Sequence, residues 1–553
     1  MKTKTNRHIL LVISGLALAT VPGYAQNNGP LPILWQKTYG PGIANGVGWA
    51  LPRDFVQTPD GGFIIAGAVG GPTNNIRTAT PCRVGEFWVI KIDAQGQRQW
   101  DRSCGGGYSW NPGQSNPGDD ALRVFLEADG GFLLAGFSAS QPDCCKTAPL
   151  RPPGSSRPWN LWVVRYGAEG GKLWDQSYLP DDADVCYGGD FEPTADGAYL
   201  ACGSTGGAYG VVKFDAEGQQ LWTKNLGCSY WNGYTMALRI RETADGGFVV
   251  AGFSDSPPCA GKQAPFYGGS DPHGVLGSDI WVVRADAQQN KLWDKSYGGR
   301  SYELATDIHP LSDGGFMVFG ASTSAPVTDP SQGTRTSRLY GGADYWVVRL
   351  DSDGNQLWDK SYGGSNHDVC THAEPMPDGG WLLSGTSRSL PGGNKTSPRF
   401  GSSDFWLVRI DDQGNKLWEQ SFGGTGQEGI DYSTWSGALF MRERIKRTTD
   451  GGFLLTGYSM SSVSGLKTAP LVSQGDFWVL KLGPEPPSLR GEVTADGKFQ
   501  LCLIAPPEFQ HTIQGSTDLV TWTDVVTPPN PTGKVCLTDP DKLTHAFYRA
   551  VRR

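Results

Sequence analysis

Apolar residues in this chain gather in short runs, and Asp and Gly separate one run from the next. Within a run the apolar residues occupy consecutive positions, as in 453–457, Phe-Leu-Leu-Thr-Gly. A strand that is buried on both faces has this pattern, whereas a strand with one solvated face alternates apolar and polar residues. The pattern therefore predicts an all-β protein whose strands lie between other layers.

Three signals recur in a fixed order and define an internal repeat. The first is Asp-Gly-Gly followed by an aromatic residue, and it begins at Asp60, Asp129, Asp245, Asp313, Asp378 and Asp450, with a degenerate copy at Asp196. The second is a tryptophan in an apolar run that ends in Arg or Lys, and it contains Trp88, Trp162, Trp281, Trp346, Trp406 and Trp478, with a degenerate copy at 209–213. The third is a further strand with a tryptophan, and it contains Trp100, Trp174, Trp222, Trp293, Trp358 and Trp418.

The seventh copy of the third signal lies at the start of the chain. Residues 34–40, Leu-Trp-Gln-Lys-Thr-Tyr-Gly, match 357–363, while the last repeat, which ends near Leu482, has no such copy. The N-terminal strand would complete the last repeat, which is the closure that a ring needs. In the fifth repeat we expect four strands, near 303–311, 315–321, 344–350 and 356–362. The repeats thus predict a seven-bladed β-propeller closed by the N-terminal strand.

Residues 1–25 have the layout of a secretory signal peptide, with cations near the start, an apolar run over 9–19 and small residues before Gln26. The apolar run is too short for a comfortable membrane span, and no later segment approaches the required length. We therefore expect a secreted monomer without a membrane span, extracellular or at the cell surface, with the periplasm as a further possibility.

The remaining chain divides into two parts of different pattern. The repeats occupy 26–483, and a Pro-rich linker at 484–487 ends them. Residues 488–553 contain further strand-like runs and predict a small C-terminal β domain similar to a β-sandwich. Cys502 and Cys536 could form a disulfide within it.

Charge narrows the choice of partners. The formal net charge is −8, and removal of the three signal-peptide cations gives −8 − 3 = −11. Nucleic acids require a basic surface, and anionic lipids attract one. We therefore expect neither a nucleic-acid partner nor electrostatic binding to a membrane.

The repeat unit resembles a known family. A full copy is 404–411, Asp-Phe-Trp-Leu-Val-Arg-Ile-Asp, followed by 416–418, Lys-Leu-Trp, and 422–424, Phe-Gly-Gly. It is similar to the tandem repeats of large exported bacterial surface proteins, mostly uncharacterised and predicted to be propellers. The tail, with 515–519 and 547–550, resembles small β modules that end other exported bacterial proteins. The resemblance implies a propeller, and display or attachment for the tail, without implying an activity.

Comparison of the repeats separates structural from functional residues. One position always holds a cation, namely Lys91, Arg165, Lys213, Arg284, Arg349, Arg409 and Lys481. We interpret these cations, and the Asp that follows two residues later in five repeats, as ion pairs or turn caps of the blade. We expect His367 and His372 in an exposed loop rather than on a metal. No catalytic, zinc-binding or phosphate-binding motif occurs, so we expect no catalytic residue, metal or cofactor.

The connections of each blade fall on two faces, because successive strands run in opposite directions. The short turns share one face, while the long second-to-third-strand loops and the blade-to-blade connections share the other, more variable face. Variable loops on a rigid scaffold commonly carry function. Three connections hold aromatic pairs, namely Tyr108 and Trp110, Tyr230 and Trp231, and Tyr432 and Trp435. These rings either bind a glycan or protein ligand or pack the loops against one another.

Most of the 11 cysteines map to the same loop face or its margin. Bridges between consecutive loops are plausible for Cys228 with Cys259, and for Cys104 with Cys144 or Cys145. Since the number is odd, at least one thiol stays unpaired or bonds to another molecule. Such bridges would preorganise a binding surface or protect the loops against proteolysis.

Three functions are compatible with these features. The first is a noncatalytic binding or scaffold protein that presents the loop face to a glycan or protein. The second is a polysaccharide-active hydrolase or lyase, for which this face could supply the carboxylates of Asp119, Asp120, Asp181, Asp182, Asp184 and Glu428. The third is a purely structural protein of the cell envelope.

Overall fold

The computed structural model describes residues 31–552 apart from gaps at 44–47, 83–84, 108–117, 151–158, 181–182, 184–185, 206, 228–233, 270–276, 430–442, 494–498, 506–509, 517–520, 530–533 and 538–546. Within this part the chain is all-β, and its one helical turn is the 3-10 segment η1 (Pro330–Gln332). None of the described helical structure is long and apolar enough to cross a membrane.

Seven four-stranded antiparallel sheets make up most of the described chain. Six are formed by consecutive strands: β2–β5 (Trp49–Gln57, Phe63–Gly70, Glu86–Ile92, Arg98–Cys104), β6–β9 (Asp119–Leu126, Phe132–Ser138, Asn160–Tyr166, Lys172–Tyr178), β10–β13 (Tyr187–Pro193, Tyr199–Ser204, Ala208–Phe214, Gln220–Gly227), β14–β17 (Thr235–Glu242, Phe248–Ser254, Asp279–Ala285, Lys291–Tyr297), β18–β21 (Glu303–Pro310, Phe316–Ser322, Asp344–Leu350, Gln356–Tyr362) and β22–β25 (Asp368–Pro375, Trp381–Ser387, Asp404–Ile410, Lys416–Phe422). The seventh combines β26 (Arg444–Arg447), β27 (Phe453–Ser459) and β28 (Asp476–Leu482) with β1 (Ile33–Tyr39).

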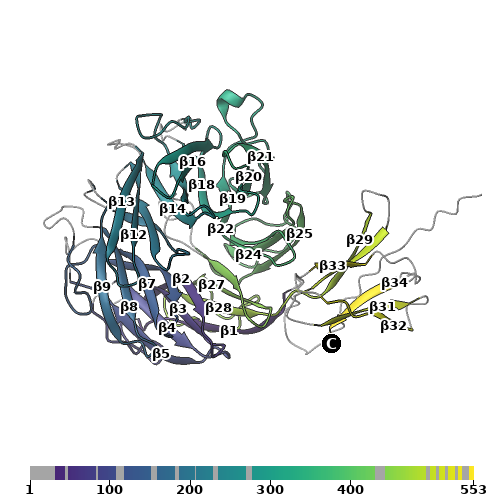
Figure 1. Ribbon diagram of the computed structural model, residues 1–553. Helices are drawn as coiled ribbons and strands as arrows, with labels where there is room; N and C mark the ends of the chain where they lie inside the picture. The colour runs from purple at the N-terminus through teal and green to yellow at the C-terminus, as the bar shows by residue number, and fades with distance from the viewer. Residues whose placement is uncertain are drawn as a thin grey trace, which may run out of the picture.

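Neighbouring sheets pack against each other in the order of the chain. Their first strands contact one another in succession, β2 with β6, then β10, β14, β18, β22 and β26, and β26 again contacts β2. Figure 1 shows the sheets following one another around a common centre, in a propeller-like arrangement. The first strand of each sheet therefore lies nearest that centre.

The N-terminal strand β1 takes the place of a fourth strand in the last sheet, where it pairs with β28. Gln36 accepts hydrogen bonds from Nε1 of Trp478 (3.1 Å) and from the N–H of Thr468 (2.9 Å). In the sheet β18–β21, Asp359 likewise accepts a hydrogen bond from Nε1 of Trp346 (2.8 Å) and others from loop N–H groups. The residues of β1 thus make the same contacts as those of β21.

The hydrophobic core lies between sheets rather than in one central mass. Trp346 of β20 is fully buried and belongs to one cluster with Ile280 and Val282 of the preceding sheet. The equivalent tryptophans of five other sheets are equally buried, namely Trp88, Trp162, Trp281, Trp406 and Trp478. These rings bury large apolar areas at the boundaries between sheets, as the apolar runs predict.

The recurrent charged residues hold the turns of each sheet. Lys91 pairs with Asp60 of its Asp-Gly-Gly turn at 2.8 Å. The other six pairs are Arg165–Asp129, Lys213–Asp196, Arg284–Asp245, Arg349–Asp313, Arg409–Asp378 and Lys481–Asp450. Asp351 caps the following turn by accepting the N–H of Asn355 at 2.7 Å. Both sets therefore have the structural role inferred from their repetition.

A bulge in the first strand explains a recurrent glycine in the second. In β18 the register shifts between Ala305 and Asp307. A Cβ atom on the facing Gly320 would lie 1.9 Å from the carbonyl oxygen of Leu304. The same approach, at 1.8–2.0 Å, occurs at Gly67, Gly136, Gly252 and Gly385. Glycine is required here by close backbone approach at a bulge.

The C-terminal residues form two three-stranded sheets. One contains β29 (Ser488–Val493), β30 (Phe499–Ile504) and β33 (Lys534–Leu537), and the other contains β32 (Thr523–Val526), β31 (His511–Ser516) and β34 (Phe547–Arg552). Leu501, Leu503, Ile513 and Tyr548 share one apolar cluster between them. A disulfide joins Cys502 of β30 to Cys536 of β33.

Candidate functional site

Long loops and blade-to-blade connections lie together on one face, where backbone hydrogen bonds join them. In the connection between β21 and β22, the carbonyl of Gly363 accepts the N–H of Asn394 at 3.0 Å. Asn394 belongs to the next long loop, between β23 and β24. The same contact joins Gly298 to Thr334, Gly423 to Leu466, and Gly105 to Lys146. These four connections are therefore each fixed to a neighbouring long loop, which gives this part of the loop face a defined shape.

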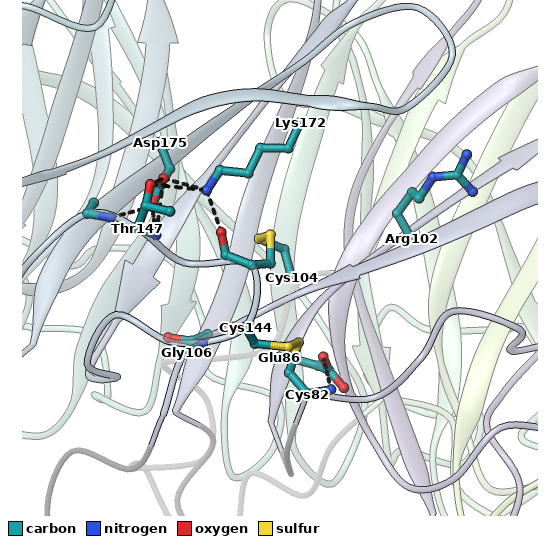
Figure 2. The surroundings of a disulfide bond; sticks show 12 residues. Cys82, Glu86, Arg102, Cys104, Gly106, Cys144, Thr147, Lys172 and Asp175 are labelled. Carbon is teal, nitrogen blue, oxygen red and sulfur yellow. Dashed lines mark hydrogen bonds and ion pairs between the residues drawn. A yellow bond between two sulfur atoms is a disulfide. The ribbon is translucent and has the colours of Figure 1, made fainter.

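Two disulfides add covalent links at one part of the loop face. Cys82, between β3 and β4, is bonded to Cys144 between β7 and β8, and the link joins two neighbouring sheets. Cys104, at the end of β5, is bonded to Cys145, one of the two partners considered from the sequence. Figure 2 shows the first bond beside Glu86, whose Oε2 accepts the N–H of Cys82 at 3.1 Å.

The segment that follows these disulfides is anchored to β9. Lys172 donates a hydrogen bond to the carbonyl of Cys145 and lies 2.5 Å from Oδ1 of Asp175 (Figure 2). Asp175 also accepts the N–H of Ala148 at 2.8 Å. The paired cysteines thus sit on a loop that is hydrogen-bonded to β9.

Among the remaining cysteines of the propeller-like part, one forms a disulfide and others are buried thiols. Cys259 is disulfide-bonded, and its expected partner Cys228 lies outside the described residues. Cys186 and Cys370 are buried free thiols. Burial raises the pKa of both thiols, which makes their nucleophilic thiolate forms unfavourable.

The six aromatic candidates all lie outside the described residues, namely Tyr108, Trp110, Tyr230, Trp231, Tyr432 and Trp435. Asp181, Asp182 and Asp184 lie outside them as well. The connections that contain the aromatic pairs follow β5, β13 and β25, the last strands of three different sheets.

The described carboxylates proposed for catalysis are buried beneath the loops. Asp119 is 1% exposed and accepts hydrogen bonds from Ser140 Oγ (2.7 Å) and the N–H of Gly106 (3.2 Å). Glu428 is fully buried, and its pKa is raised to about 7 mainly by burial. Asp120 forms an ion pair with Arg53 at 2.5 Å. These carboxylates therefore hold loops and strands, and a substrate on the surface would not meet them.

Carboxyl groups recur in pairs at the boundaries between sheets. Asp279 begins β16 and Glu303 begins β18, and burial together with the charge of Glu303 raises the pKa of Asp279 to about 8. Equivalent pairs are Glu86 with Asp119, Asp344 with Asp368, and Asp404 with Glu428. Because the arrangement recurs, it belongs to the joints between sheets rather than to one catalytic centre.

The structure reveals a charged ring that the sequence reasoning missed. Its members lie on the first strand of each sheet, six residues before the Asp of the Asp-Gly-Gly turn, and they are Asp54, Arg123, Asp190, Arg239, Asp307, His372 and Arg444. None of the seven is more than 5% exposed. The signal that could have found them is the alternation of acid and base at one repeat position.

Ion pairs connect the charged ring from sheet to sheet. Arg123 lies 2.8 Å from Asp190, and Arg239 lies 3.2 Å from Asp307. A second cation, Arg241, contacts both acids, Asp190 at 2.9 Å and Asp307 at 3.0 Å. Buried charges persist only when they are paired in this way.

Asp54 gathers three cations, two from β26 and one from β6. Lys446 lies 2.6 Å, Arg444 3.5 Å and Arg123 3.7 Å from its carboxylate oxygens. Burial alone would raise the pKa of Asp54, but these cations hold it well below its ordinary value. Asp54 therefore stays ionised at the centre of the molecule.

The expectation of an exposed loop is wrong for His372. It lies on β22, is 4% exposed, and places Nδ1 2.8 Å from Oδ2 of Asp307. The bulge between Cys370 and His372 sets the register of the strand at this point. Within the described residues, no group of His, Cys, Asp and Glu is arranged to hold a metal ion.

Comparison with known proteins adds little to this picture. No family model matches the chain. The regulatory protein FlaEY of Caulobacter vibrioides is 25% identical over 158 residues, which are 28% of this chain and 16% of that protein. The chain therefore matches less than a fifth of the length of this relative.

Several solved structures are similar at low sequence identity. The PQQ-bound aldose sugar dehydrogenase of Streptomyces coelicolor is 11% identical, with 83% of this chain and 99% of that chain covered and a TM-score of 0.30. Prolyl oligopeptidase B of Galerina marginata is 9% identical, with 83% and 56% covered and a TM-score of 0.37. Drosophila plexin A, in complex with Semaphorin 1b, is 10% identical, with 73% and 86% covered and a TM-score of 0.29. None of these likenesses bears on activity.

Proposed function

We propose that residues 26–483 form a seven-bladed β-propeller whose ring is closed by the N-terminal strand. The pairing of β1 with β28, the contact of β26 with β2 and the charged ring around Asp54 support this closure. Residues 488–553 form a separate small β domain after the linker at 484–487. Residues 1–25 are a signal peptide, and the disulfides fit an oxidising compartment outside the cytoplasm.

The propeller is a secreted, noncatalytic binding or scaffold protein that presents its loop face to a glycan or protein ligand. The observation that carries this proposal is the bracing of that face. Hydrogen bonds fix four of the connections to a neighbouring loop, and Cys82–Cys144 links the loops of two sheets. A surface that is ordered before binding loses less conformational entropy when a ligand binds.

The contact residues of this proposal are the three aromatic pairs of the connections. Tyr and Trp offer large rigid rings with a polar atom, which suits stacking on sugars and anchoring of proteins. The described carboxylates of the same face, Asp119, Asp120 and Glu428, are buried and already bonded, so they favour binding over hydrolysis.

Glycan-array and pull-down screens with the oxidised, full-length protein test this function. We expect a reproducible ligand, and a loss of about tenfold or more in affinity when Trp110, Trp231 and Trp435 are replaced by Ala. The matched control replaces Leu173 and Leu292, which are 62% and 55% exposed on outer strands, by Ala. Blank screens, or equal loss in the control, would contradict the proposal.

A further inference from the structure

The charged ring contains a defect that follows from its odd number of members. Signs alternate from Asp54 through Arg123, Asp190 and Arg239 to Asp307. Acids and bases cannot alternate strictly around a ring of seven positions, so two neighbouring members must both be acids or both be bases. In this chain those two are His372 and Arg444, on the neighbouring strands β22 and β26.

Unused hydrogen-bond donors mark the defect. Nε of Arg444 donates to the carbonyl of Arg53 at 3.0 Å, but neither Nη1 nor Nη2 has a hydrogen-bond partner among the described residues. Nδ1 of His372 faces Oδ2 of Asp307 at 2.8 Å, so the neutral ring carries its proton on Nδ1, and Nε2 is an acceptor without a partner among the described residues. Buried polar groups are otherwise almost always bonded, so the two Arg444 donors call for a ligand.

The other arginines of the ring do not share this situation. Arg123 donates to the carbonyl of Phe191 and pairs with Asp190. Arg239 pairs with Asp307 and donates to the carbonyl of Thr371, reaching from β14 across to β22. Among the arginines of the ring, only Arg444 thus has terminal nitrogens without a hydrogen-bond partner among the described residues.

The surroundings of Arg444 are electropositive. Its side chain is fully buried, and burial, Arg123 and Arg239 lower its pKa to about 9, although Asp54 and Asp190 oppose this. The guanidinium therefore remains charged at neutral pH and faces two further guanidinium groups. Removing a guanidinium from water without full pairing is unfavourable, and a counter-ion offsets this cost.

We propose that the defect between His372 and Arg444 binds a small monovalent anion of the size of chloride. The anion accepts from Nη1 and Nη2 of Arg444. Because none of the ring is more than 5% exposed, only a monatomic or similarly small anion suits the position. The anion is enclosed as the chain folds and is part of the folded structure.

Thermal unfolding at constant ionic strength tests the site. We expect Tm to rise with chloride or bromide by about 1–3 °C per tenfold increase in concentration, relative to the bulky anion gluconate. Arg444→Lys should abolish this dependence, whereas Arg335→Lys, at a buried arginine bonded to Ser322 and Ser361, should retain it. Equal Tm in chloride and gluconate for the wild type would overturn the proposal.

Anomalous diffraction from crystals grown in bromide provides the second measurement, which does not depend on variants that fold poorly. The expected result is a bromide peak within hydrogen-bond distance of Nη1 or Nη2 of Arg444. A bromide peak only at the surface, or none in the ring, would overturn the proposal. Arg444→Met should remove the peak, and its stability should be the same in all three anions.

Discussion

Individual residues in this protein act mainly by joining one sheet to the next. The indole N–H of Trp346 donates to Asp359, and the same donor–acceptor pair recurs as Trp281 with Asp294 at 3.1 Å. At the joints between sheets, buried carboxyl groups accept loop N–H groups while facing a second acid. The joints are therefore where protonation changes the stability of the fold.

Asp279 should make stability depend on pH. Its pKa is raised to about 8 by burial and by Glu303. A raised pKa means that its stabilising contribution is complete below about pH 4 and is lost as the pH rises through about 8. The free energy of unfolding of the wild type should therefore fall by up to a few kcal/mol as the pH rises over this range. Asp279→Asn should reduce this fall, as measured by urea unfolding from pH 5 to 9.

The control for this experiment is Asp286→Asn on the opposite face. Asp286 caps an exposed turn, and hydrogen bonds from Asn290 lower its pKa. Its stabilising contribution is therefore complete above about pH 4 and is lost only at lower pH, outside the range measured. An unchanged slope in Asp279→Asn, or the same flattening in Asp286→Asn, would show that the joint carboxyls do not control the dependence.

At the scale of elements, the bulged first strand and the glycine of the second strand form one unit. Gly320→Ala would place a methyl group 1.9 Å from the carbonyl oxygen of Leu304. We expect destabilisation of about 1–3 kcal/mol or more, since the two backbones must separate. Gly171→Ala is the control, because nothing lies within 4 Å of its added methyl group. Similar Tm values for both variants would rule out the proposed steric role.

The N-terminal strand should depend on Gln36 as four other sheets depend on the Asp that accepts from their buried tryptophan. Gln36→Ala leaves Trp478 Nε1 and the N–H of Thr468 without an acceptor, and we expect a loss of about 1–3 kcal/mol. Gln36→Glu keeps an acceptor and should be much closer to the wild type. Guanidinium unfolding of the two variants makes the comparison, and a fully stable Gln36→Ala would contradict this role.

At the scale of the whole molecule, repeated patterns were predictable and non-repeated details were not. The Asp-Gly-Gly and tryptophan signals predicted the strands of the fifth repeat to within about one residue, because each repeat poses the same packing problem. The charged ring escaped notice, since its members vary in sign and pair only after folding brings distant strands together. His372 was misplaced for the same reason, because its partner Asp307 lies in another repeat.

The candidate binding residues illustrate a different limit. Loop aromatics are visible in the sequence, but their convergence depends on how connections from three sheets fold over the same face. The disulfide between Cys82 and Cys144 was also not anticipated, because it joins loops 62 residues apart in the chain. Its position supports the view that the loop face is held ready for a ligand.

The affinity of disulfide variants for the ligand found in the screens tests this central claim most directly. Removing the Cys82–Cys144 bond with Cys82→Ser and Cys144→Ser should weaken binding by about tenfold, because the loop face is no longer preorganised. Removing the Cys502–Cys536 bond in the same way should leave the affinity unchanged. Unchanged affinity in the first variant, or equal loss in both, would contradict the account.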